Sequence, residues 1–278
     1  MRAFQVLVRT ADEDEATAIL WQAGTSGIEI KADTEGNLAL VAYFPENTLL
    51  EDVNAALAGL PGGPRAEALE VPAVDWVQRF REGFRGFRAG SFEVLPTWEL
   101  SPDRDRRDPG LLVVDPGRAF GTGTHETTRL CLAAIEALAA KGPLGRTLDV
   151  GTGAGLLAVA AAKRGARTVV GVDHDPDATR AARQHAALNG VRLGVVLADG
   201  GRALRAGAFD LVLANLTAPL LIERRDEIVS LLAHAGALVL SGVLEAEASR
   251  VASAYSRLGA PRVWTEGEWT ALEFRGRP

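Results

Sequence analysis

The stretch LDVGTGAGLLAVAAAKRGARTVVGVDHDP, Leu148 to Pro176, decides the fold class of this chain. It contains an apolar strand, a glycine loop, a helix, a second apolar strand and an acidic turn. Gly151, Gly153 and Gly155 alternate directly after the first strand, and glycines in that place predict that a ligand contacts bare backbone. A strand, a helix and a second strand form the repeating unit of a doubly wound parallel sheet.

The same alternation continues over the rest of the chain. Apolar strands separated by helices are predicted at 111–115, 147–151, 168–173, 194–199, 209–216 and 237–244. Strands that are apolar throughout are typical of a parallel sheet covered on both faces. Residues 261–276 predict a terminal hairpin. We therefore expect an α/β fold, with a seven-stranded, doubly wound, Rossmann-like sheet and an antiparallel last strand, in a catalytic domain of residues 111–278.

The first 71 residues follow a different order, β-α-β-β-α-β, which predicts a small ferredoxin-like α+β domain. We expect residues 72–110 to connect the two domains. Within them, DWVQRFREGFRGF (75–87) mixes aromatic residues with arginines. That mixture suits a stacking surface for nucleic acid, but more often the aromatics pack inward and the arginines face water.

Composition narrows the class of protein. Cys131 is the single cysteine, so an internal disulfide or a cysteine-rich metal site is excluded, and we expect no metal. The start has no apolar stretch typical of a signal peptide, and no apolar run approaches the length of a membrane span. We expect a cytoplasmic protein that has no membrane partner.

The charge is distributed unevenly. The whole chain carries −6, whereas residues 1–60, with 3 basic and 10 acidic residues, carry −7. An acidic chain is a poor partner for a nucleic-acid backbone. The acidic segment is either an ordinary solvated surface or a face for a basic partner. In the second case we expect the acids at 12–15 and 51–52 to act together.

The residues around the glycine loop indicate which ligand it binds. A dinucleotide site needs G-x-G-x-x-G, and here Leu156 stands where the last glycine would be. Asp149 is expected to repel a pyrophosphate and to attract an ammonium or sulfonium group. Asp173, at the end of the second strand, is placed to accept both hydroxyls of a ribose. The sequence thus predicts a ligand that contains adenosine and carries a positive charge but no phosphate. S-adenosylmethionine has these properties and is the expected cofactor.

Two further strand ends carry polar residues. Asp199 ends the third strand and is expected to meet the adenine amino group, although a role as a turn or cap acid is equally open. Asn215 ends the fourth strand within ANLTAPLL (214–221), where the transferred methyl group should lie. Many nitrogen methyltransferases carry Asn-Pro-Pro-Tyr there, so the match is partial. Asn215 also suits the cap of a helix predicted at 217–232.

DPGRAFGTGTHETT (115–128) is the most specific string in the chain. With DVGTGAGLLAVAAAKRGA, GVDHDP and ANLTAPL, it closely resembles the bacterial PrmA family, and the front domain fits that family too. The resemblance implies S-adenosylmethionine-dependent methylation of lysine side chains and the terminal α-amine of ribosomal protein L-eleven, a basic partner recognised by the front domain. Thr128, Gly151, Gly153, Asp173 and Asn215 are then cofactor contacts.

The chain departs mildly from the family pattern, because Glu126 replaces a frequent Pro and Leu216-Thr217 a frequent Ile-Leu. Gly121 and Gly123 would let the 115–128 loop close over a ligand, with Thr127 or Thr128 capping the next helix. His125 is a candidate base, but a structural histidine is the simpler interpretation.

Methyl transfer needs mainly positioning of the attacking amine, and Asn215 is our candidate catalytic residue. We expect a monomer that needs no nucleic acid. The alternatives are a methyltransferase for another protein, an RNA or a small-molecule amine, and a non-catalytic nucleotide-binding module.

Overall fold

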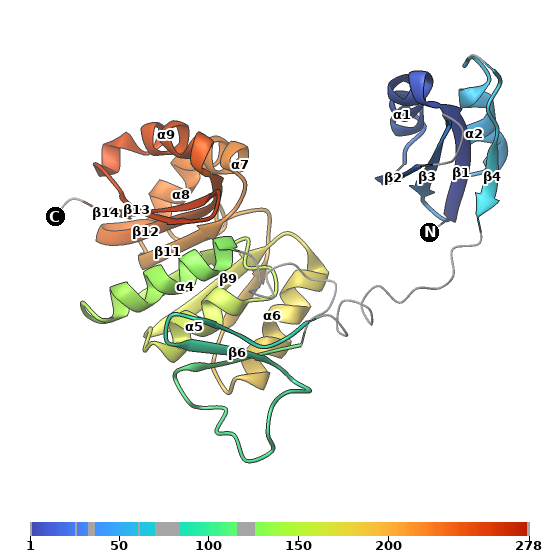
Figure 1. The fold of residues 1–278 in the computed structure, drawn as a ribbon. Helices are drawn as coiled ribbons and strands as arrows, with labels where there is room; N and C mark the ends of the chain where they lie inside the picture. The colour runs from blue at the N-terminus through green and yellow to red at the C-terminus, as the bar shows by residue number, and fades with distance from the viewer. Residues whose placement is uncertain are drawn as a thin grey trace. The chain divides into compact units, whose positions relative to one another are not determined.

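The computed structural model of the chain describes residues 2–25, 27–32, 37–60, 62–69, 84–115 and 126–276. The chain forms two compact units, residues 1–75 and residues 76–278 (Figure 1). Each unit has its own buried core.

The first unit has the predicted ferredoxin-like order. Its elements are β1 (Arg2–Arg9), the 3₁₀ turn η1 (Thr10–Asp12), α1 (Glu13–Gln22), β2 (Gly27–Ala32), β3 (Asn37–Phe44), α2 (Leu50–Leu57) and β4 (Ala66–Leu69). The antiparallel sheet has the strand order β2-β3-β1-β4. Every second residue of β1, namely Phe4, Val6 and Val8, is buried in this unit's core.

The two acidic groups, residues 12–15 and 51–52, lie at opposite ends of the sheet. Arg2 pairs with Phe44 and Arg9 with Asn37, so α1, which follows Arg9, begins at the other end of β1 from α2, which follows Phe44. A strand of eight residues spans about 23 Å, and the Debye length is about 10 Å at 0.1 M salt. The expectation that residues 12–15 and 51–52 act together is therefore wrong, because the two helices run in opposite directions.

A small sheet opens the second unit. Its strands are β5 (Phe87–Ala89), β6 (Phe92–Pro96) and β7 (Leu111–Val114), in that order, with β6 and β7 parallel. Residues 84–110, which the sequence left as a connection, thus contribute two strands to this unit. β7, named above among the eight predicted strands, belongs to the small sheet, which leaves seven for the large sheet, the number expected. Asn189 holds β7: its side-chain amide accepts from Val113 N at 2.8 Å and donates to Val113 O at 2.7 Å.

The large sheet confirms the predicted α/β class. Its strands are β8 (Arg146–Val150), β9 (Thr168–Asp173), β10 (Gly194–Leu197), β11 (Phe209–Asn215), β12 (Leu232–Leu244), β13 (Arg262–Glu266) and β14 (Trp269–Arg275). They lie in the order β10-β9-β8-β11-β12-β14-β13, and β14 runs antiparallel to both neighbours. The strand order reverses between β8 and β11, which is where ligands bind in such sheets.

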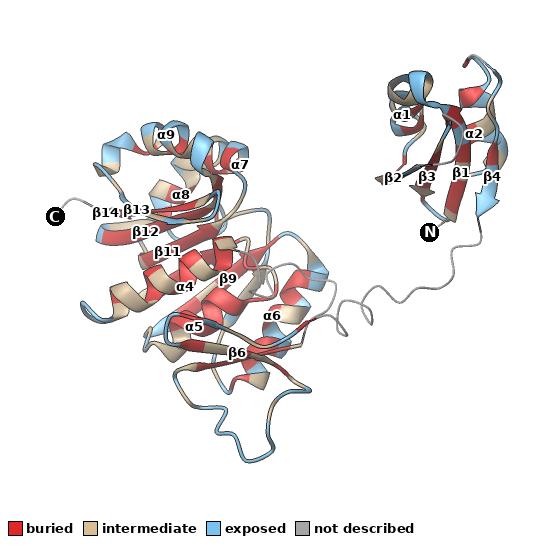
Figure 2. Cartoon of the chain, in the orientation of Figure 1, coloured by how far each residue is buried: buried red, intermediate tan, exposed pale blue. Residues whose placement is uncertain are grey.

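Helices pack on both faces of the large sheet, and most of its strands are buried (Figure 2). They are α4 (Glu126–Ala139), α5 (Leu156–Lys163), α6 (Pro176–Leu188), α7 (Ala218–Glu223), α8 (Arg225–Leu231), α9 (Glu245–Ala254) and the turn η2 (Ser256–Leu258). Leu211 and Leu213 of β11 pack with the α4 and α5 side, whereas Val212 and Ala214 pack with the α7 to α9 side. The helix predicted at 217–232 is divided at Arg224. In the described parts of the chain, every helix is too short or too polar to cross a membrane.

Candidate functional site

The glycine loop connects β8 to α5 at the carboxyl edge of the sheet. All three glycines have left-handed backbones, with φ of +68° at Gly151, +53° at Gly153 and +81° at Gly155. A Cβ at Gly151 would lie 2.5 Å from Leu216 Cδ2, and one at Gly155 would lie 2.9 Å from Ala182 Cβ. The loop therefore requires glycine for its own conformation and packing.

The amides of this loop are used inside the protein. Gly151 N and Thr152 N both donate to Val172 O, at 2.9 Å and 3.0 Å, and Gly153 N donates to Asp173 Oδ2 at 2.8 Å. A pyrophosphate on a glycine loop is held by free backbone N–H groups. These three amides are already bonded, so the loop suits a ligand without phosphate.

Asp173 stands at the end of β9 and is 8% exposed. Its two oxygens accept from Gly153 N at 2.8 Å and from Asp175 N at 3.0 Å. His174 Nδ1 also lies 3.5 Å from Asp173 Oδ1. A carboxylate has about four acceptor positions, so positions remain for a ligand, above all on Oδ2. This arrangement suits a pair of hydroxyls and fixes the side chain in advance.

A cavity of about 660 Å³ lies at the carboxyl edge, between the ends of β8, β9, β10 and β11. Its volume is within the range of small-molecule sites. Gly151, Gly153, Asp173, Asp199 and Asn215 all line it. The fold therefore brings together four of the five predicted cofactor residues, and Asp199 with them.

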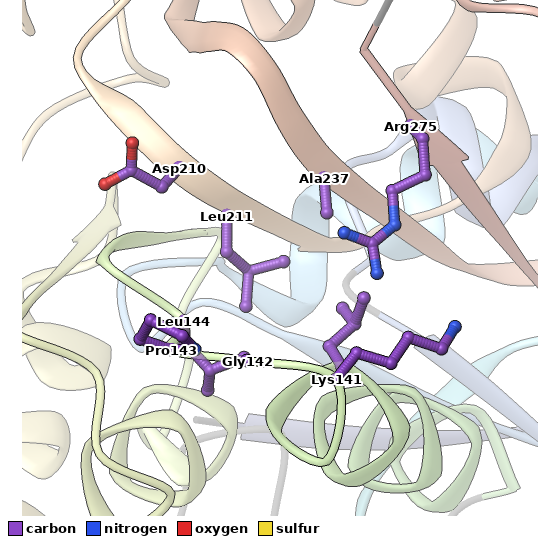
Figure 3. A pocket seen from close by; sticks show the side chains of 9 residues that line it. Lys141, Gly142, Pro143, Leu144, Asp210, Leu211, Ala237 and Arg275 are labelled. Atoms are coloured by element: carbon purple, nitrogen blue, oxygen red, sulfur yellow. The ribbon is translucent and has the colours of Figure 1, made fainter. Parts of the chain in front are cut away.

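A second hollow of about 100 Å³ lies at the opposite edge of the sheet (Figure 3). Lys141 and Pro143, just after α4, line it with Asp210 near the start of β11 and Arg275 at the end of β14. It lies at the amino ends of the parallel strands and is far below the size of a typical ligand site. The larger cavity is the candidate site.

Asp199 and Arg224 form an ion pair at the wall of the larger cavity, and both residues line it. Arg224 Nη1 also lies 3.9 Å from Glu227 Oε1. The sequence did not single out Arg224, because the position was predicted to lie within one continuous helix.

Asn215 meets the first turn of α4. Its Nδ2 donates to Thr127 Oγ1 at 3.3 Å, and Ser241 Oγ of β12 donates to Thr127 O at 3.1 Å. Thr217 is the N-cap of α7, so the capping role considered for Asn215 is wrong. Thr127 was considered only as a helix cap, and sequence spacing alone could not have paired it with Asn215.

Thr128 lies beside Thr127 on α4 but points elsewhere, since neighbouring helical residues are about 100° apart. It is 2% exposed, and its hydroxyl has no partner among the described residues. It is not among the described residues lining the cavity, so its cofactor contact stays a prediction. Phe120, Gly121, Gly123 and His125 of the same motif lie outside the described residues.

Asp149 is 1% exposed and does not line the cavity, so the attraction expected of it does not come from contact with a ligand there. Its Oδ2 accepts from Thr152 Oγ1 at 2.7 Å, and its carboxyl also bonds the backbone of Ala158 in α5. The pKa of Asp149 is raised to about 6, mainly by burial and to a smaller extent by the charge of Asp173, against the lowering effect of these bonds. Asp149 supports the loop from below.

His185 of α6 connects two loops. Its Nδ1 lies 2.7 Å from Ala154 O in the glycine loop, and its Nε2 accepts from Asp115 N at 2.8 Å. These partners require a neutral ring with the proton on Nδ1. Burial lowers the pKa of His185, which favours that form. The sequence did not single out this residue.

Comparison with known proteins gives the family. Residues 2–277 match the family described as ribosomal protein L11 methyltransferase (PrmA). The chain belongs to this family. A ribosomal protein L11 methyltransferase of Geobacter sulfurreducens is 41% identical over 249 residues, covering 87% of this chain and 78% of that protein. One of Syntrophotalea carbinolica is 36% identical over 296 residues, covering 96% and 95%.

A solved structure is also similar to this chain. The crystal structure of a ribosomal protein L11 methylase from Lactobacillus delbrueckii subsp. bulgaricus matches with a TM-score of 0.62 at 28% identity, covering 70% of this chain and 100% of that one. PrmA membership confirms the predicted enzyme class, a methyltransferase that uses S-adenosylmethionine. The cavity fits that cofactor, because Asp173 keeps acceptor positions for hydroxyls and the amides of Gly151, Thr152 and Gly153 are already bonded within the protein.

Proposed function

We propose that this PrmA protein methylates ribosomal protein L11, on lysine side chains and on the terminal α-amine. The observation that carries the proposal is the position of Asn215, which lines the cofactor cavity at the end of β11 and has its amide held by Thr127. The relatives named as L11 methyltransferases over most of the chain support the substrate.

The cofactor is held by residues from three strand ends. These residues line the cavity, where Asp173 would accept the ribose hydroxyls, Gly151 and Gly153 would let the backbone approach, and Asp199 would accept from the adenine amino group. When bound, S-adenosylmethionine supplies a methyl group activated by its sulfonium. Asp173 and Asp175 line the same cavity and would make it favourable for a ligand that carries a positive charge.

Asn215 positions the amine. A lysine amine has an ordinary pKa of about 10.4, and only its neutral form has the lone pair needed for attack. Asn215 Nδ2 is engaged by Thr127, so Oδ1 is the group that can accept an amine N–H. Accepting that N–H turns the amine lone pair toward the methyl group. The chain therefore contributes positioning more than acid–base chemistry.

The first unit is proposed to recognise the protein substrate. The enzyme is also proposed to act in the cytoplasm, as a monomer and without nucleic acid. The acidic charge of residues 1–60 supports a basic protein partner. A variant lacking residues 1–71 should still bind S-adenosylmethionine and should lose methylation of L11. Methylation of L11 at the normal rate by that variant would contradict the role of the first unit.

The test of the proposed function uses labelled S-adenosylmethionine with purified L11, with total ribosomal RNA and with both, followed by mass spectrometry. We expect label on L11 in the absence of RNA and none on RNA. The Asn215→Ala variant is the control, with label on L11 reduced at least about 100-fold. Label on RNA, or none on L11, would reject the proposed substrate.

A further inference from the structure

Arg224 is held against the loop that follows β10. Its guanidinium pairs with Asp199 through Nη2, and Nη1 lies 3.9 Å from Glu227 Oε1 on α8. Glu227 in turn accepts from Gly201 N. One arginine thus lies between two carboxylates. Asp199 is part of the segment at residues 199–201, and Glu227 is bonded to that segment through Gly201 N.

The backbone of that segment is shaped around this arrangement. Gly200 has φ of +78°, and a Cβ there would collide with both Glu227 Oε1 and Arg224 Nη1. The side chain of Glu227 is 7% exposed and that of Arg224 is 19% exposed, whereas that of Asp199 is 75% exposed. Asp199 is therefore the exposed member of the cluster, and the more buried Arg224 holds it.

We propose that Arg224 is a positioning residue that makes the cavity selective for a purine carrying a 6-amino group. Arg224 Nη2 takes Asp199 Oδ1 and leaves Oδ2, which has no hydrogen-bond partner among the described residues. Oδ2 then accepts from the amino group of the ligand. The inference rests on the proposed placement of the adenine beside Asp199, and it goes beyond that placement by assigning selectivity to the arginine.

Without Arg224, Asp199 would lose its anchor. An exposed carboxylate is free to rotate into water, and the buried charge of Glu227 would repel it. The hydrogen bond to the amino group would then have to be formed from a disordered side chain, which weakens it. Selectivity should fall more than general affinity, because the ribose contact of Asp173 is unchanged.

The experiment measures binding by calorimetry. The ligands are S-adenosylhomocysteine and its analogue with hydrogen in place of the 6-amino group. Hydrogen bonds to charged groups contribute enough for the wild type to prefer the amino form about tenfold or more. We expect Arg224→Met to reduce the preference to about threefold or less, as Asp199→Asn should. Arg224→Lys, which keeps the charge but cannot span both acids, should give an intermediate value.

Arg202→Met is the matched control. Arg202 Nε lies 3.2 Å from Glu227 Oε2, but its side chain is 85% exposed and it is not among the described residues lining the cavity. It should keep the preference of the wild type. If Arg202→Met reduces the preference as much as Arg224→Met, the effect belongs to Glu227 packing and the inference is overturned.

Binding of S-adenosylmethionine, which is cationic, distinguishes a positioning role of Arg224 from a purely electrostatic one. Removing Arg224 makes the cavity wall more negative, so a purely electrostatic role would tighten the cationic cofactor and leave the preference intact. That result would overturn the inference. A preference lost in Asp199→Asn but kept in Arg224→Met would also overturn it, while leaving the adenine placement standing. A wild type without any preference would reject the placement itself. Each outcome is independent of which protein is methylated.

Discussion

Replacing Asp149 by Asn should stabilise the second unit at neutral and alkaline pH. The carboxyl is 1% exposed, and burial raises its pKa from 3.8 to about 6. Above that pH the folded protein contains a buried charge beneath the glycine loop. Asn is uncharged at every pH and resembles the protonated carboxyl in shape and in hydrogen-bonding capacity, so the variant removes the charge and little else.

The size of the effect follows from the two pKa values. The gap between 3.8 and about 6, at about 1.36 kcal/mol per pKa unit, corresponds to about 3 kcal/mol. Because the folded pKa is raised, the stabilising contribution of Asp149 is complete below 3.8 and is lost as the pH rises through about 6. The advantage of Asn should therefore be about 3 kcal/mol at pH 8 and roughly half of that at pH 5, where much of the wild-type carboxyl is still protonated in the folded state.

The assay is urea-induced unfolding of the wild type and Asp149→Asn at pH 5 and pH 8. The transition of the second unit is identified as the one that S-adenosylhomocysteine shifts to higher urea. Comparing the two proteins at each pH cancels the titration of all other groups. A stability difference that stays constant or shrinks between pH 5 and pH 8 would refute the reasoning, since it would mean that the Asp149 carboxylate is stabilised where it lies.

Three further changes give independent tests. Thr127→Val should lower kcat about tenfold, because it releases the Asn215 amide. Thr127→Ser keeps the hydroxyl and should retain most of the activity. A Val variant as active as the wild type would contradict this role. Gly155→Ala should lower the free energy of unfolding by about 2–4 kcal/mol, measured with urea, because φ is +81° and the new methyl group would press on Ala182. Asp173→Ala should weaken S-adenosylmethionine binding by at least about 30-fold in calorimetry, and unchanged affinity would remove it from the site.

The small sheet and the division of the helix at Arg224 illustrate what sequence patterns miss. β5 and β6 are three and five residues long, too short for a periodic pattern to stand out from a connection. The chain from Ala218 to Leu231 contains a single break, the turn at Arg224, which no glycine or proline marks. Both features depend on packing against residues far away in the sequence.

By itself the sequence determined the α/β class, the glycine loop and the strand ends that carry Asp173 and Asn215. Asp199, expected at the end of a strand, lies two residues beyond β10, and all three side chains line one cavity. These features are local, because strand periodicity and glycine backbone preferences act within a few residues, and parallel strands bring their carboxyl ends to one edge.

Only the tertiary structure decided the direction of each charged side chain. Asp149 points into the core, where its charge is costly, while three amides of the glycine loop are bonded to Val172 and Asp173 rather than left for a phosphate. Arg224 reaches Asp199 across 25 residues of sequence. The physical reason is that the energy of a charge depends on burial and on neighbours from other elements, and these are set only when the strands and helices pack together.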